Sequence, residues 1–204
     1  ARRDGDALGD LEGVARAEDL VEKKSLVAAE RDRPDVAARR AEWALWRAGI
    51  DPRRLVFVDE TWTKTNMTRL RGWGPTRERV VDRTPHGHWK TSTLVAALGH
   101  DGMRASMLVD GAIDRAAFEA YVERVLGPTL RSGEIVVMDN LTSHTGPRVR
   151  AMIEARGAEV MYLPPYSPDL SPIEPAFSTI KQALRSQGWR TLDELWSGFH
   201  PRKE

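Results

Sequence analysis

The 204-residue chain contains no cysteine. Disulfides, thiolate zinc sites and cysteine nucleophiles are therefore excluded together, and the composition fits a reducing compartment. The chain also lacks any run of about 18 apolar residues, which a membrane span would need, and residues 1–30 are too charged for a signal peptide. We therefore expect a soluble, cytoplasmic protein that has no membrane partner.

A strong excess of one charge is also absent, because the formal net charge is only +1. Any affinity for nucleic acid must then come from a local patch. Residues 61–90 hold seven Lys or Arg against two acidic residues, a net charge of +5. We predict a DNA contact here, with a solvated loop as the alternative. The candidate contacts, two of them outside this run, are Arg69, Arg71, Arg77, Arg79, His88, Lys90, His144 and Lys181.

The pattern of apolar residues and turn signals predicts an α/β domain. It indicates three strands, then two strands that each follow a helix, so the sheet should be mixed, with three antiparallel strands and then two parallel ones. Helices should flank this five-stranded sheet. The expected strands are 54–59, 90–98, 103–109, 134–139 and 159–163, and the expected helices are 34–48, 114–131, 146–156 and 172–187.

Three acidic residues stand in apolar or proline-rich surroundings. Asp59 follows the apolar run 55–58, Asp139 follows the apolar run 135–138, and Glu174 lies in the first turn of the last expected helix. A carboxylate at the end of a buried strand is costly unless it faces a cleft. Three such groups could bind two divalent cations, which take oxygen ligands and catalyse phosphoryl transfer. The pattern favours a Mg²⁺-dependent enzyme that cuts and joins nucleic-acid strands.

Each acid also has a structural alternative. Asp139 could cap a turn, and Glu174 could cap its helix at the positive end of the macrodipole. Glu60 competes with Asp59, but successive strand residues point to opposite faces, so only one can face the site, and we choose Asp59. His144, five residues after Asp139, could touch a phosphate or move a proton, and a buried structural histidine is an equal alternative.

These residues together resemble the DDE transposases of the mariner superfamily, in particular their bacterial insertion-sequence branch. The resemblance covers residues 51–196 and rests on Val58–Thr61, on Met138–Asn140 followed by His144, and on the motif Leu163–Glu174. Thirty-four residues separate Asp139 from Glu174, which is typical of this branch. The resemblance implies a ribonuclease H-like fold and a catalytic triad of Asp59, Asp139 and Glu174. These acids would hold two Mg²⁺ ions, for which Mn²⁺ could substitute.

The same resemblance implies double-stranded DNA partners, namely transposon ends and target DNA, and a homodimer when the protein acts on DNA. We expect 1–50 to be a charged, truncated N-terminal segment without helix-turn-helix units, 51–196 the catalytic domain, and 197–204 a short tail. The expected activity is DNA strand cleavage and strand transfer at the nucleoid of a bacterium. Two alternatives stay open: a catalytically incompetent DNA-binding remnant, and a related ribonuclease H-fold nuclease.

Overall fold

A computed structural model gives the fold and describes residues 28–69, 71–75, 77–83 and 89–188, with the single positions 191 and 194. The segment 1–27, the tail 197–204 and His88 lie outside the described residues, so the expectations for them stay predictions. None of the helices in the described ranges is long and apolar enough to cross a membrane.

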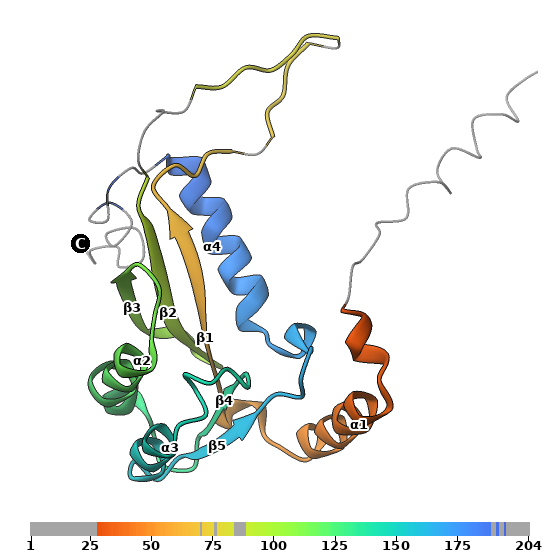
Figure 1. The fold of residues 1–204 in the computed structure, drawn as a ribbon, viewed down its shortest axis with the longest axis vertical. Coiled ribbons are helices and arrows are strands. Elements are labelled where there is room, and N and C mark those ends of the chain that lie inside the picture. Colours follow the sequence, from red (N-terminus) through yellow and green to blue (C-terminus); the bar gives the residue numbers. More distant parts are fainter. Residues whose placement is uncertain are drawn as a thin grey trace, which may run out of the picture.

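The core of the molecule is one five-stranded sheet (Figure 1). Its spatial order is β3-β2-β1-β4-β5. The first three strands pair antiparallel, whereas β4 runs parallel to β1 and β5 runs parallel to β4. The predicted mixed sheet is confirmed. The strand bounds are β1 Leu55–Lys64, β2 Thr91–Gly99, β3 Gly102–Asp110, β4 Ile135–Met138 and β5 Glu159–Tyr162.

Helices cover both faces of the sheet, because alternate residues of the central strands are apolar on each face. Val56 and Val58 pack on one face with α2 (Arg115–Tyr121) and α3 (Pro147–Glu154). Leu55 and Phe57 pack on the other face with α1 (Pro34–Ala48) and α4 (Ile173–Gln187). The apolar stripe of α4 faces the sheet, since Ile173, Phe177 and Leu184 are buried.

Two expected elements differ from the observed ones. β1 continues five residues beyond Asp59, to Lys64, because Thr61, Trp62 and Thr63 extend the antiparallel pairing with β2. The expected helix 114–131 ends as α2 at Tyr121 and continues as a π-helical turn, η4 (Val122–Leu126), and a 3₁₀ turn, η5 (Gly127–Thr129). Pro128 explains the break, because proline has no N–H to donate and its ring clashes with the preceding turn.

The proline-rich loop before α4 is fastened to α1 by one guanidinium group. Arg40 donates to both carboxylate oxygens of Asp169, at 3.0 and 2.8 Å, and to the hydroxyl of Ser167 at 2.6 Å. Hydrogen bonds from Arg40 are the main reason why the pKa of Asp169 is lowered. The bidentate pair therefore fixes the loop that leads the chain into α4.

Replacing Arg40 by methionine should weaken this connection while keeping the apolar stem of the side chain. We expect a loss of unfolding free energy on the order of 1 kcal/mol at pH 7, because solvent screens a pair whose Asp169 is 41% exposed. Since the pKa of Asp169 is lowered in the folded state, the pair stabilises above the unfolded pKa of about 3.9 and less as pH falls below it.

Urea unfolding of wild type and Arg40→Met between pH 3 and 7 measures this difference. The curves should converge at the acidic end. Arg33→Met is the matched control, because Arg33 pairs with Asp35 two residues away, where both side chains are more than half exposed. An equal effect of both substitutions, or a difference that does not depend on pH, would contradict the role of Arg40.

Candidate active site

Asp59 lies in the middle of β1, and not at its end as the sequence suggested. It faces the side of the sheet that α4 covers, because it alternates with Leu55 and Phe57 of that face. Its neighbour strand β4 has already ended at Met138 at this level. At Asp59, β1 therefore has no paired strand on its β4 side, although β1 itself continues before and after this residue.

Asp139 is the first residue after β4. β1 and β4 pair Phe57 with Val137, so extending that register by two residues sets Asp139 opposite Asp59. The backbone N–H of Leu141 donates to Oδ1 of Asp139 at 3.1 Å. The amide of the next residue, Asn140, donates to the carbonyl of Leu163, which ties this loop to the residue after β5. The loop therefore fixes the backbone on which Asp139 stands.

Glu174 lies in the first turn of α4, as predicted. Its backbone N–H donates to the carbonyl of Ser171, which continues the turn after Pro172. The adjacent Ile173 is buried and anchors the start of the helix on the sheet. The side chain of Glu174 is exposed, so it is reachable from solvent and is not held against the sheet. At the sheet boundary, where we expected Glu174, the adjacent residue Ile173 is buried instead.

The three carboxylates form one electrostatic cluster. Burial raises the pKa of Asp59 to about 7, while a hydrogen bond from the backbone N–H of Glu60 at 2.8 Å acts in the opposite direction. The negative charges of Glu174, Asp139 and Glu60 raise the pKa further. Asp59 is therefore affected by the charges of both other candidate acids. Such an environment is typical of a site that binds cations or moves protons.

His144 contacts two carboxylates, that of Asp139 after β4 and that of Glu60 in β1. Its Nδ1 lies 2.6 Å from Oδ1 of Asp139, and its Nε2 lies 2.7 Å from Oε2 of Glu60. Burial disfavours the charged imidazole, but the hydrogen bonds to Asp139 and Glu60 outweigh it and raise the pKa of His144 to about 9. The side chain is completely buried, so it fits the structural alternative and offers no surface to a phosphate.

The donor set suits a hard divalent cation, because all three acids offer oxygen ligands. Among the described residues, the side-chain hydrogen bonds of Asp59 and Asp139 all use Oδ1, and no partner reaches Oδ2 of either. Within the same residues, however, no group of three or more acidic or histidine side chains lies close enough to hold an ion as it stands. Two carboxylate oxygens are thus left available.

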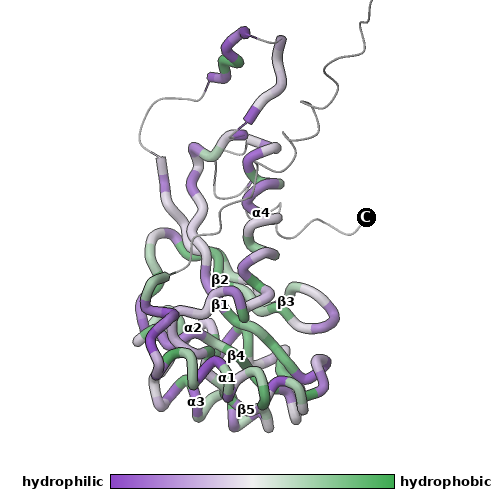
Figure 2. Tube along the Cα trace, turned by 90° about the vertical axis from the view of Figure 1, so that its right-hand side faces the viewer, coloured by the Kyte–Doolittle hydropathy of each residue, from purple (hydrophilic) through white to green (hydrophobic). Residues whose placement is uncertain are grey.

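The candidate DNA contacts separate into two groups. The first lies in the projecting segment, residues 65–90, which extends beyond the ends of β1 and β2 and is largely hydrophilic in its described parts (Figures 1 and 2). Trp73 there is fully exposed. Lys181 belongs to α4 instead, where its ammonium lies 4.4 Å from the centre of the Trp62 ring. The exposed basic members of the first group are Arg69, Arg71, Arg77, Arg79 and Lys90.

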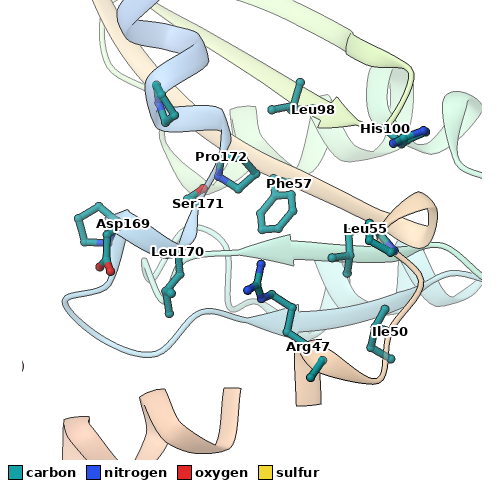
Figure 3. Close-up of a pocket in the computed structure, with 15 residues that line it drawn as sticks. Arg47, Ile50, Leu55, Phe57, Leu98, His100, Asp169, Leu170, Ser171 and Pro172 are labelled. Carbon is teal, nitrogen blue, oxygen red and sulfur yellow. The ribbon is translucent and has the colours of Figure 1, made fainter. Parts of the chain in front are cut away.

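A large cavity of about 990 Å³ lies between the α1 side of the sheet and the loop that leads into α4 (Figure 3). Phe57, Leu98 and Leu170 contribute apolar lining, and Arg47 and His100 stand at its margin. None of the three candidate acids lines it. We therefore place the candidate site at the carboxylates, where the pKa of Asp59 is raised, and not in this cavity.

Comparisons with known proteins identify the family of the chain. The model of a family described as DDE superfamily endonuclease matches residues 54–196. A comparison with curated proteins returned no match. Among solved structures, the chain is similar to the Mos1 mariner paired end complex with Mn, with a TM-score of 0.69 and 20% identity over 88% of this chain and 58% of that one.

Two further structures give the same result. The pre-cleavage Mos1 transpososome has a TM-score of 0.67 and 17% identity, with 91% of this chain and 60% of that chain covered. The catalytic domain of Mos1 mariner transposase has a TM-score of 0.59 and 18% identity, with 90% and 87% covered. These likenesses confirm the expected ribonuclease H-like fold. The chain spans about 60% of the length of the Mos1 chain in the transpososome.

The raised pKa of Asp59 predicts how stability depends on pH when no metal is bound. Between about pH 4 and 7 the folded state keeps a proton that the unfolded state has lost, so the unfolding free energy of the wild type should fall as pH rises. Asp59→Asn keeps an acceptor for the N–H of Glu60 but carries no charge. We expect this variant to be more stable than wild type at pH 8, with a gain of about 1.4 kcal/mol per unit of pKa shift.

Urea unfolding in EDTA at pH 4.5, 6 and 8 measures the effect. The gain should shrink as pH approaches 4. Asp110→Asn, at the end of β3, is the control and should follow the wild type at every pH. Parallel pH dependences for wild type and Asp59→Asn would show that Asp59 is not strained by its neighbours.

Proposed function

Because this chain belongs to the DDE superfamily endonucleases, we propose that it is the catalytic domain of a DNA transposase that cleaves and transfers DNA strands. One observation supports the proposal, namely that the charges of Asp139 and Glu174 act on the partly buried Asp59. Asp59 lies in β1, Asp139 follows β4, and Glu174 lies in the first turn of α4. The proposed catalytic residues and metal ligands are these three acids.

Divalent cations, Mg²⁺ or in its place Mn²⁺, would be held by the three acids and would, when bound, activate the attacking oxygen and stabilise the leaving one. The chain supplies the positions of these ligands. Asp59 and Asp139 each use Oδ1 in hydrogen bonds within the protein and keep Oδ2 available. Near neutral pH the carboxyl group of Asp59 is partly protonated, and it must release this proton before a cation can bind. No side-chain nucleophile is needed.

The spacing of 34 residues between Asp139 and Glu174 supports membership of the bacterial insertion-sequence branch. A member of that branch would act at the bacterial nucleoid, on transposon ends and then on target DNA, and as a homodimer. The solved Mos1 chains that resemble this one include complexes with transposon ends. For this chain, such ends and the second copy are part of the proposal.

The projecting segment is the surface that we propose for DNA. It carries six exposed basic side chains, namely the five named above and Arg83, and exposed Trp89 lies within it while exposed Trp62 precedes it. Cationic side chains of this kind bind phosphates and carry no sequence information. Stacking of Trp73 on an unpaired base would add affinity in the same sequence-tolerant way. We therefore expect general DNA binding from this segment.

Asp139→Asn tests the proposed chemistry. The amide preserves the volume and removes the charge, so we expect Mg²⁺- or Mn²⁺-dependent nicking of supercoiled plasmid to fall at least about 100-fold, the scale of removing an electrostatic catalytic group. Asp110→Asn is the matched carboxylate control and should nick normally. A strand-transfer assay with a pre-cut end distinguishes a transposase from a related nuclease. Near-normal nicking by purified Asp139→Asn would refute the assignment.

Charge reversal at Arg77 and Arg79 tests the DNA surface. We expect weak binding that falls steeply between about 50 and 200 mM salt, with little preference for an inverted-repeat end over a scrambled duplex. The double variant should weaken binding equally for both duplexes and flatten the salt dependence by about one unit per lost phosphate contact. Arg124→Glu, exposed near the end of η4, is the control. Strong end-specific binding would contradict this prediction.

A further inference from the structure

The contact between Glu60, His144 and Asp139 has no part in the function proposed so far. Glu60 stands on the α2 and α3 face of β1, opposite to Asp59. His144 reaches it around the open edge of the sheet and contacts Asp139 with its other nitrogen. A fully buried imidazole thus connects the two faces at the point where β4 ends.

Several contacts fix the imidazole. Its ring centre lies 4.2 Å from that of Phe118, a buried residue of α2. Its backbone N–H donates to the carbonyl of Leu141, and its carbonyl accepts from the hydroxyl of Tyr162 at 3.2 Å. The contacts of Nδ1 with Asp139 and of Nε2 with Glu60 then set the orientation of the ring.

The consequence falls on Asp139. Its Oδ1 accepts from two donors, Nδ1 of His144 at 2.6 Å and the backbone N–H of Leu141 at 3.1 Å. Two hydrogen bonds to one oxygen set the rotation of the carboxylate. Oδ2 is left without a partner among the described residues. The carboxylate therefore stands in one orientation before any ligand arrives, although 41% of its side chain is exposed.

We propose that His144 and Glu60 are positioning residues, and that they hold Asp139 with Oδ2 directed to a divalent cation. This inference rests on the proposed function, since it assigns a metal ligand its orientation. Partners of this kind commonly fix metal ligands, and their loss typically lowers metal affinity by about 10–100-fold. Glu60 is then no bystander, even though it faces away from Asp59. An uncharged acceptor at this position would still accept a hydrogen bond from Nε2, without the charge that Glu60 adds.

A pair of substitutions at Glu60 tests the inference. Glu60→Ala removes the acceptor for Nε2, whereas Glu60→Gln keeps a carbonyl oxygen in the same place. We expect Glu60→Ala to weaken Mn²⁺ binding, measured by electron paramagnetic resonance of free Mn²⁺, by about 10–100-fold. Glu60→Gln should stay within a few-fold of wild type. In nicking assays the metal concentration at half-maximal rate should shift equally, while the rate at saturating Mn²⁺ should change little.

A shift of the metal concentration at half-maximal rate, without a change in the rate at saturating Mn²⁺, distinguishes a positioning role from a structural one. A variant that is merely less stable would lose rate at saturating metal and keep the midpoint. His144→Ala should shift the midpoint at least as far as Glu60→Ala, and thermal unfolding shows whether it folds. Glu60 is partly exposed, with 18% of its side chain accessible, so the Glu60 pair remains informative if the His144 variant does not fold. Glu123→Ala, on an exposed part of η4, is the unchanged control.

The outcomes are distinguishable. An unchanged Mn²⁺ midpoint in folded Glu60→Ala, or an equal shift in Glu60→Ala and Glu60→Gln, overturns the positioning role. Asp139→Asn in the same titration reports on the proposed function itself. If Asp139→Asn also binds Mn²⁺ normally, the metal site has failed. If Asp139→Asn loses Mn²⁺ and Glu60→Ala does not, only the positioning role has failed.

Discussion

The candidate site depends on a mismatch in strand length. β1 has ten residues and β4 has four, so β4 ends while its neighbour continues. The edge of β1 that this exposes carries Asp59 toward one face and Glu60 toward the other. The chain leaving β4 must fill the gap, and it does so with Asp139 and His144. A β4 of the same length as β1 would cover these positions with paired backbone, and the acids would have no common space.

The helices around this gap have different tasks. α4 supplies the third acid, and its buried residues Ile173 and Phe177 hold it on the sheet. α1 contributes no candidate ligand, but Arg40 secures the loop that precedes α4, and Trp43 packs in the core of the same face. The N-terminal helix is therefore an integral part of the face on which the acids lie. On the opposite face, Phe118 of α2 supports the imidazole of His144.

Sequence patterns predicted the mixed sheet and its flanking helices, because these follow from local periodicity and turn signals. The length of β1 was missed, since Thr61, Trp62 and Thr63 favour a strand but lie in a run that its charges marked as a loop. The break at Pro128 carried a readable signal. The pairing of Arg40 with Asp169 did not, because 129 residues separate them and Arg40 belongs to no motif.

Glu60 shows the limit of reasoning from alternation. The rule that neighbouring strand residues face opposite sides correctly separated Asp59 from Glu60. It did not reveal that the side chain of a third residue, His144, contacts both Asp139 and Glu60. His144 was noticed for its distance from Asp139 along the chain, but its second partner lies 84 residues earlier. Only the folded arrangement shows that contact.

The adjacency of Asp59 and Glu60 makes the identity of the site a matter of strand register. If β1 slipped by one residue against β2, the two carboxylates would exchange faces. Glu60 would then point toward α4, and Asp59, shorter by one methylene, would meet the histidine. Eight successive residue pairs, from Phe57 with Leu98 to Lys64 with Thr91, oppose such a slip. The antiparallel pairing of β1 and β2 thus determines which of the two neighbouring acids lies on the face that α4 covers.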